Sequence, residues 1–303
     1  MREVLIEDFK QLTERNIPWN ELRDKTFLIT GATGLVGSLL VRCLLYANET
    51  INLNAKVYAV VRNTDKADRI FEDEKTDALS YIVADLATEK VCCEGECDYI
   101  IHAAAVTASK LMVSDPVGTI RTSIDGTEKM LQLAVETKVR AFIYIYSMEI
   151  YGQPKTEGKT AEKDLGYVDI ETVRSCYPEG KRMCECMCTA YAAQYGVNVI
   201  SARLAQTFGA GILPTENRVF AQFARSAING DTKVAVNLIA TQDAIRPPMW
   251  NAPSPARLIW FAENIIHTPV PVKISGIIDS TTLPILRLLV SGPISKYLIA
   301  SSG

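Results

Sequence analysis

Apolar residues in the first two thirds of the chain form short continuous runs, separated by longer segments in which apolar positions recur with helical spacing. Continuous apolar runs are typical of strands buried on both faces, which requires helices on each side of a parallel sheet. The expected strands are residues 27–29, 57–61, 79–83, 99–101, 141–146 and 197–202. The expected helices include residues 39–47, 115–138 and 178–195. The pattern therefore predicts an α/β fold built on a doubly wound parallel sheet.

The first strand and the first helix are joined by a glycine-rich turn at residues 30–37, which reads TGATGLVG. Glycines let the backbone turn sharply and approach a phosphate closely, and the N–H groups at the start of the helix then face the negative charge. A strand, a tight glycine turn and a helix in this order indicate the pyrophosphate site of a dinucleotide in a Rossmann fold.

The chain is expected to have three regions. Residues 1–24 carry a separate helical pattern broken near Pro18, so they form a helical extension packed outside the sheet. Residues 25–204 form the dinucleotide-binding Rossmann domain, and residues 205–303 form a smaller C-terminal substrate lobe.

Composition and charge exclude several classes of protein. The chain has 303 residues, of which 48% are hydrophobic and 22% charged, so it can bury a full core. A net charge of −3 without a basic stripe argues against a nucleic-acid partner. Acidic residues at the start argue against a secretory signal, and no apolar run reaches the roughly 18 residues that span a bilayer. We expect a cytoplasmic protein without a membrane partner.

Three of the eight cysteines, Cys184, Cys186 and Cys188, alternate in a way that raises the question of zinc. On a helix, Cys184 and Cys188 share a face while Cys186 points away, so the three cannot close on one ion. Only two histidines are present to complete a ligand set. We therefore expect no metal, and reduced thiols that are mostly buried.

Arg62 follows the second expected strand, where an acidic residue would accept hydrogen bonds from the ribose 2′-hydroxyl of NAD. A guanidinium there pairs with the 2′-phosphate of NADP, stacks on adenine or simply lies in solvent. This position leaves the choice between NAD and NADP open.

Tyr177 and Lys181 lie one helical turn apart and therefore on the same face. A tyrosine has a pKa of about 10, and a neighbouring cation favours its phenolate, which can then take a proton from a hydroxyl. Ser147 and Glu149 follow the fifth strand, at the sheet edge where ligands of doubly wound folds collect. The four residues are candidates for one catalytic site.

Five motifs occur together and in order: TGATGLVG, HAAA at residues 102–105, SMEIYG at 147–152, YPEGKR at 177–182 and RLAQTFGAGI at 203–212. In this combination the chain resembles the extended short-chain dehydrogenase/reductases, in the NAD-dependent epimerase/dehydratase group that acts on nucleotide sugars. The resemblance covers about residues 25–230, and the UDP-glucuronate decarboxylases look most similar, followed by the dTDP-glucose 4,6-dehydratases.

The resemblance implies a role for each matching residue. Tyr177 is the expected base, and Lys181 would hold the nicotinamide ribose and lower the tyrosine pKa. Ser147 would bond the C4 hydroxyl that is oxidised to a 4-keto group by hydride transfer to NAD. Loss of carbon dioxide, loss of water or inversion at C5 can then follow before the hydride returns. Glu149 stands where decarboxylases and dehydratases carry a glutamate. The cofactor contacts would be Gly31, Thr33, Gly34, Leu35, Val36, Gly37, Arg62, Asp85, Leu86, Ala103, Ala104, Ala105, Tyr177 and Lys181. Gln206 and Arg218 would contact the sugar nucleotide, and a homodimer would form through the helices at residues 115–138 and 178–195.

The chain also departs from the family. Met148 replaces the aspartate that protonates the leaving hydroxyl in dehydratases, and a thioether cannot donate a proton, which argues against 4,6-dehydration. After about residue 230 the expected motifs are missing and prolines interrupt the region, as either a frame shift or a divergent or degraded substrate lobe would produce. Two alternatives to the sugar-nucleotide enzyme therefore stay open, a catalytically silent dinucleotide-binding protein and an NADP-dependent carbonyl reductase.

Overall fold

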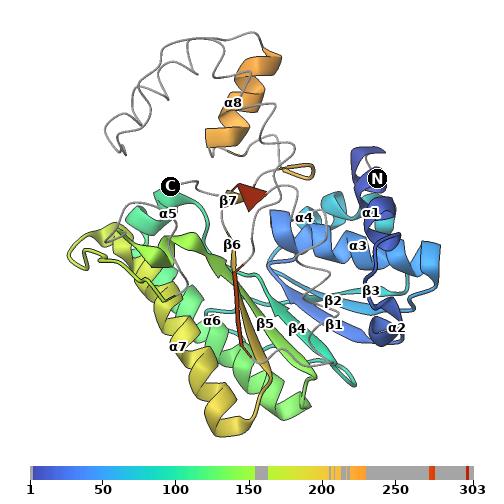
Figure 1. Ribbon diagram of the computed structural model, residues 1–303, viewed down its shortest axis with the longest axis horizontal. Coiled ribbons are helices and arrows are strands. Elements are labelled where there is room, and N and C mark those ends of the chain that lie inside the picture. Colours follow the sequence, from blue (N-terminus) through green and yellow to red (C-terminus); the bar gives the residue numbers. More distant parts are fainter. Residues whose placement is uncertain are drawn as a thin grey trace.

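A seven-stranded sheet forms the centre of the computed structural model, with strand order β3-β2-β1-β4-β5-β6-β8 (Figure 1). The strands are β1 Thr26–Thr30, β2 Lys56–Val61, β3 Leu79–Val83, β4 Tyr99–His102, β5 Ala141–Ser147, β6 Val199–Leu204 and β8 Lys273–Gly276, and β7 Gln206–Thr207 pairs separately with β9 Leu298–Ile299. The first six strands of the sheet run parallel, and β8 joins β6 antiparallel at the edge. The doubly wound parallel sheet is therefore confirmed.

The structure describes residues 3–153, 163–204, 206–207, 209–212, 216, 219–229, 273–276 and 298–299. The α-helices are α1 Glu3–Thr13, α2 Trp19–Leu22, α3 Leu35–Ile51, α4 Thr64–Ile70, α5 Ser109–Ser114, α6 Pro116–Thr137, α7 Cys176–Tyr195 and α8 Val219–Ile228. The short 3-10 helices are η1 Glu72–Glu74, η2 Met148–Tyr151 and η3 Val173–Ser175. Most of the expected substrate lobe, including the proline-rich segment after residue 230, lies outside the described residues.

Two apolar clusters fill the two sides of the sheet. Both contain residues of β1, β2, β4, β5 and β6, because successive side chains of a strand point to opposite faces. One cluster is completed by helices α1–α4 and the other by α6 and α7, which lie on opposite sides of the sheet (Figure 1). Helix α1 belongs to the first cluster, because its residues Leu5, Phe9 and Leu12 are almost fully buried. The extension at residues 3–24 therefore packs onto the core of the sheet domain through one apolar face.

Local signals explain where the long helices begin and end. Asp115 caps α6 by accepting a hydrogen bond from the Gly118 backbone N–H at 3.0 Å, and Pro116 follows in the first turn, where it costs no backbone bond. Helix α7 ends at Gly196, which adopts a left-handed conformation with φ of 70°. These two helices pack against each other along one side of the sheet.

The elements differ from the sequence expectation in several ways. The sixth strand begins at residue 199 and ends at 204, two residues later at each end than expected. Strand β3 is only partly buried, because it lies at the sheet edge. The short helices α4 and α5 were not predicted, since both have fewer than eight residues and little apolar periodicity.

The strand register brings the ends of β1, β4 and β5 to one edge of the sheet. Thr30 pairs with His102 at the ends of β1 and β4, and Ser147 closes β5 opposite Leu204. The glycine turn and the expected catalytic segment therefore lie at the same edge, where parallel sheets bind ligands. Among the helices of the described ranges, none is long and apolar enough to cross a membrane.

Candidate active site

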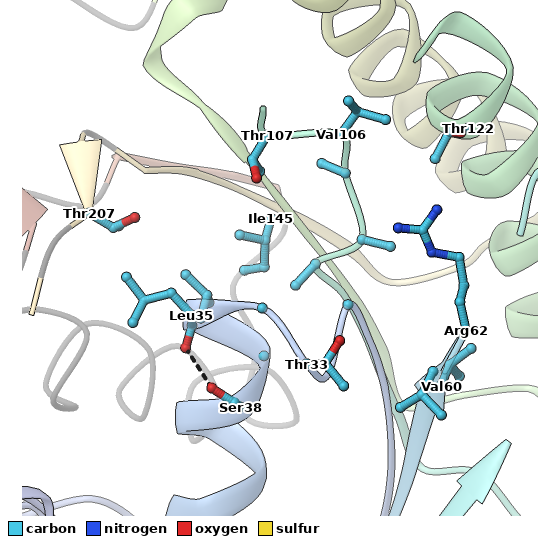
Figure 2. Close-up of a pocket in the computed structure, with 18 of the residues that line it drawn as sticks. Thr33, Leu35, Ser38, Val60, Arg62, Val106, Thr107, Thr122, Ile145 and Thr207 are labelled. Atoms are coloured by element: carbon cyan, nitrogen blue, oxygen red, sulfur yellow. Dashed lines mark hydrogen bonds between the residues drawn. The ribbon is translucent and has the colours of Figure 1, made fainter. Parts of the chain in front are cut away.

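A pocket of about 940 Å³ opens along this edge of the sheet (Figure 2). It is lined by every expected catalytic and cofactor residue: Gly31, Thr33, Gly34, Leu35, Val36, Gly37, Arg62, Asp85, Leu86, Ala103, Ala104, Ala105, Ser147, Glu149, Tyr177 and Lys181. Gln206 begins β7, and its neighbour Thr207 lines the pocket. The Gln206 side chain and the whole of Arg218 lie outside the described residues.

At Gly31 and Gly37 the glycine turn leaves no room for a side chain. A Cβ on Gly37 would lie 2.3 Å from the backbone oxygen of Gly31, and a Cβ on Gly31 would lie 2.7 Å from that of Ala103. Gly31 also has φ of +63°, a conformation that glycine adopts without strain. Gly34 is the N-cap of α3, and the first turn of that helix, which includes Leu35 and Ser38, lines the pocket (Figure 2). The turn fits the pyrophosphate of a dinucleotide.

Hydrogen bonds of His102 and Thr30 hold the HAAA segment, residues 102–105, beside the glycine turn. The two ring nitrogens of His102 lie 2.8 Å from Thr30 Oγ1 and 3.1 Å from Thr127 Oγ1, and the side chain is almost fully buried. The Ala104 N–H donates to the same Thr30 hydroxyl at 3.1 Å. Burial, aided by the nearby charge of Lys181, lowers the pKa of His102 to about 3. His102 is therefore neutral and holds the chain beside the glycine turn.

The end of the pocket beside β2 carries several basic side chains. Arg62 follows β2 and points toward the space between β2 and α6, near Thr122 (Figure 2). Lys66 and Arg69 of α4 line the same end, together with the acidic Glu72 and Asp73. No acidic residue directly follows β2, so this end of the pocket still does not decide between NAD and NADP.

Tyr177 and Lys181 lie in the first two turns of α7 and share the face that lines the pocket. Both side chains are buried, with 6% and 1% of their surface exposed. The Lys181 ammonium lies 4.8 Å from the centre of the Tyr144 ring, which attracts a cation through its face. Burial lowers the pKa of Lys181 from 10.5 to about 8. The phenol and the ammonium therefore lie together in a site with little solvent.

The low pKa of Lys181 predicts a stability cost. Below pH 8 the lysine is charged in both the folded and the unfolded protein, and burying the charge costs about 3 kcal/mol. Between pH 8 and 10.5 only the unfolded chain stays protonated, so the cost disappears as the pH rises. Lys181→Met should therefore raise the free energy of unfolding at pH 7, and the gain should shrink toward pH 10.

Urea unfolding of the cofactor-free protein at both pH values measures this effect. Lys90→Met is the control, because Lys90 pairs with Glu136 at an exposed site, where losing the ion pair should change stability little. Equal stabilities of Lys181→Met and the wild type at pH 7 would contradict the prediction.

Ser147 and Glu149 lie where β5 passes into η2. The Ser147 hydroxyl accepts a hydrogen bond from the Glu149 backbone N–H at 3.2 Å, which shapes the turn. The Glu149 carboxylate accepts hydrogen bonds from Arg174 Nη2, with its two oxygens at 2.8 and 3.1 Å. The Arg174 guanidinium carbon also lies 5.4 Å from the centre of the Tyr177 ring.

Sequence reasoning missed Arg174. Its position three residues before Tyr177, one turn back along the chain, was the only signal available. Several pocket residues that follow β4 or lie on α5 and α6 were also not predicted from the motifs. These are Val106, Thr107, Ser109, Met112 and Thr122, of which Figure 2 labels three.

The cysteines are arranged as the helical spacing predicts. Cys184 and Cys188 are buried against the sheet, and Cys186 is exposed on the other side of α7. Within the described part of the chain, no group of three His, Cys, Asp or Glu residues could hold a metal ion.

A family model and individual relatives identify the same family of proteins. The model of a family described as "NAD dependent epimerase/dehydratase family" matches residues 27–250. UDP-glucuronic acid decarboxylase 1 of Xenopus tropicalis is 30% identical over 207 residues, covering 68% of this chain and 47% of that protein. UDP-glucuronic acid decarboxylase 6 of Arabidopsis thaliana is 32% identical over 211 residues, covering 67% and 57%. The chain thus spans about half the length of these relatives.

Solved structures share the fold. A UDP-N-acetylglucosamine 4-epimerase from Methanobrevibacter ruminantium, in complex with UDP-N-acetylmuramic acid, superposes with a TM-score of 0.56 at 19% identity, covering 69% of this chain and 64% of that one. The dTDP-glucose 4,6-dehydratase DesIV from Streptomyces venezuelae, with NAD bound, superposes with a TM-score of 0.53 at 22% identity. The match covers 68% of this chain and 62% of that one.

Proposed function

Because the chain belongs to the NAD dependent epimerase/dehydratase family, we propose that it is an enzyme that binds NAD and oxidises the C4 hydroxyl of a nucleotide sugar. The observation that carries the proposal is the shared pocket. One wall is the glycine turn with the exposed start of α3, and the buried Tyr177 and Lys181 lie in the same space. A dinucleotide at the turn and a sugar hydroxyl at the phenol can therefore occupy one site.

Each residue has a role that its position allows. Gly31, Gly34 and Gly37 cradle the pyrophosphate, where the start of α3 supplies N–H groups. Bound NAD supplies the acceptor for the hydride from the sugar. Tyr177 takes the hydroxyl proton, Lys181 keeps a positive charge beside the phenol below about pH 8, and Ser147 orients the hydroxyl. Glu149 acts on the sugar after oxidation.

The proposed substrate is UDP-glucuronate, and the proposed reaction is its decarboxylation through a 4-keto intermediate, which classes the protein as a lyase. A keto group at C4 stabilises the carbanion that loss of carbon dioxide leaves at C5, and so makes this loss feasible. C5 would then take up a proton and C4 would take back the hydride from the bound cofactor, which gives UDP-xylose and regenerates NAD. The relatives named UDP-glucuronic acid decarboxylase support this choice. Met148 speaks against dehydration, because it has no proton to give to a departing hydroxyl.

The test is incubation of the purified protein with NAD and UDP-glucuronate, followed by detection of carbon dioxide and UDP-xylose. Equal amounts of both products are expected. UDP-glucose is the matched control, because it lacks the carboxylate and should release no carbon dioxide. Absence of turnover with every UDP- or dTDP-hexose, despite bound NAD, would favour a silent dinucleotide-binding protein instead.

A second candidate, an NADP-dependent carbonyl reductase, rests on Arg62, Lys66 and Arg69 at the end of the pocket beside β2. A titration with both dinucleotides separates the two candidates. Tighter binding of NAD supports the nucleotide-sugar enzyme, and a strong preference for NADPH supports the reductase.

We further propose that the protein is cytoplasmic and forms a homodimer through α6 and α7. Apolar side chains on these helices, among them Val117, Ile120 and Met183, are exposed in the single chain. Light scattering coupled to size-exclusion chromatography measures the mass, and twice the 33.4 kDa of one chain is expected.

A further inference from the structure

One side chain, Arg174, contacts two of the proposed catalytic residues although it does not line the pocket itself. Arg174 belongs to η3, directly before α7. Its Nη2 donates to both oxygens of Glu149 in η2, at 2.8 and 3.1 Å. Its guanidinium also lies over the ring of Tyr177, 5.4 Å from the centre. Glu149 and Tyr177 come from different elements, and Arg174 joins them.

The segment that presents Arg174 is fixed by its own hydrogen bonds. Asp169 organises it, because its carboxylate accepts from the Thr172 hydroxyl at 3.0 Å and from the Glu171 N–H at 3.1 Å. The Ser175 hydroxyl donates to the Asp169 backbone oxygen at 2.5 Å. The turn is therefore set before any ligand binds, and Arg174 needs little rearrangement to hold its partners.

The ion pair contributes little to folding. The Arg174 and Glu149 side chains are 30% and 42% exposed, and salt bridges at such sites are screened by solvent and worth little. The same guanidinium nevertheless acts on the phenol. A cation over an aromatic ring is attracted to the ring face, and it favours a phenolate over a neutral phenol.

We infer that Arg174 is a positioning residue of the site proposed above: it holds the Glu149 carboxylate and the Tyr177 ring in one arrangement at the pocket. The role of Arg174 in catalysis rests on the proposed function. The physical content of the inference, that the Arg174 charge is felt by the Tyr177 phenol, can be measured independently of turnover.

Several other titratable or charged groups surround this phenol or lie on the elements packed around it. They are Lys181 and Glu179 on α7, Glu149 on η2, Tyr144 on β5, His102 on β4, Lys110 on α5, and Arg121 and Asp125 on α6. His102 is neutral above about pH 3, and burial raises the pKa of Tyr144 well above its ordinary value. Lys181 and Arg174 are thus cations placed against aromatic rings at this site, Lys181 against Tyr144 and Arg174 against Tyr177 itself.

The experiment compares Arg174→Gln, Arg174→Lys and the wild type in the NAD-loaded protein. The phenol is titrated by ultraviolet difference absorbance, and each protein is measured with and without Tyr177→Phe to isolate one of the 12 tyrosines. Arg174→Gln should raise the pKa of Tyr177 by about one unit, and the low-pH limb of the kcat profile should move with it, giving about tenfold slower turnover at neutral pH. Arg174→Lys, which keeps the charge, should restore most of the loss.

Arg140→Gln is the matched control, because Arg140 forms a partly exposed ion pair with Asp98 outside the pocket. It should leave the phenol titration and the pH profile unchanged. A double variant, Arg174→Gln with Glu149→Gln, should be slowed by less than the product of the two single effects, since the residues act as a unit.

The outcomes separate this inference from the proposed function. If UDP-glucuronate turns over normally and Arg174→Gln leaves the phenol titration in place, the inference is wrong and the proposed function stands. If no nucleotide sugar turns over but the titration shifts as expected, the proposed function fails and the contact between Arg174 and the phenol is upheld. Thermal unfolding confirms that each variant is folded.

Discussion

Tyr177→Phe is expected to lower the rate of sugar oxidation by about 10²–10⁴-fold, the usual contribution of a positioned general base. Phenylalanine fills the same space in the buried site but has no hydroxyl to accept the proton. The change should leave dinucleotide binding nearly intact, because the glycine turn and the start of α3 are untouched. Turnover of UDP-glucuronate and a separate binding titration measure the two effects.

Tyr195→Phe is the control for this variant. Tyr195 ends the same helix, is 52% exposed and lies outside the pocket, so its loss should not change turnover. Full activity of Tyr177→Phe would remove the proposed base and, with it, the proposed chemistry.

Gly37→Ala is expected to weaken dinucleotide binding by about 100-fold, which corresponds to about 3 kcal/mol. The added methyl group would lie 2.3 Å from the Gly31 backbone oxygen, so the turn or the helix must move to admit it. Because the N–H groups at the start of α3 depend on that position, the pyrophosphate site is displaced. Isothermal titration with NAD measures the loss.

Gly196→Ala separates this effect from general backbone strain. Gly196 has φ of +70°, but an added Cβ would have no atom within 4 Å. It should cost about 1–2 kcal/mol of stability through strain alone and leave the affinity for NAD unchanged. Equal NAD binding by Gly37→Ala and the wild type would contradict the proposed role of the turn.

Local patterns in the sequence were enough to predict the six parallel strands of the sheet and the position of the pocket. Apolar runs gave the parallel strands, because burial on both faces leaves no room for polar alternation. The glycine turn predicted the position of the pocket, because only glycine fits where Gly31 and Gly37 lie. The family resemblance is confirmed by the family model, which covers residues 27–250 and so extends past the expected limit near 230.

Features that depend on distant partners could not be predicted in this way. The sixth strand continues through Arg203, whereas the predicted strand ended at residue 202, because a charged residue is not expected inside a buried strand. The Arg203 guanidinium is partly buried and donates hydrogen bonds to Glu185 at 2.8 Å and to the hydroxyls of Tyr146 and Tyr151 at 2.5 and 3.0 Å. Arg174 was missed for the same reason, because Glu149 lies 25 residues earlier in the chain.

The central claim is that a sugar hydroxyl is oxidised where the glycine turn and the Tyr177–Lys181 pair meet. It is tested most directly with UDP-glucuronate carrying deuterium at C4, mixed with the NAD-loaded protein, followed by mass spectrometry of the cofactor after rapid quenching. The account predicts transient deuterium in the recovered cofactor from the wild type, and labelling at least about 100-fold slower with Tyr177→Phe. Carbon dioxide released by the wild type while its cofactor stays free of deuterium at every time point would contradict it.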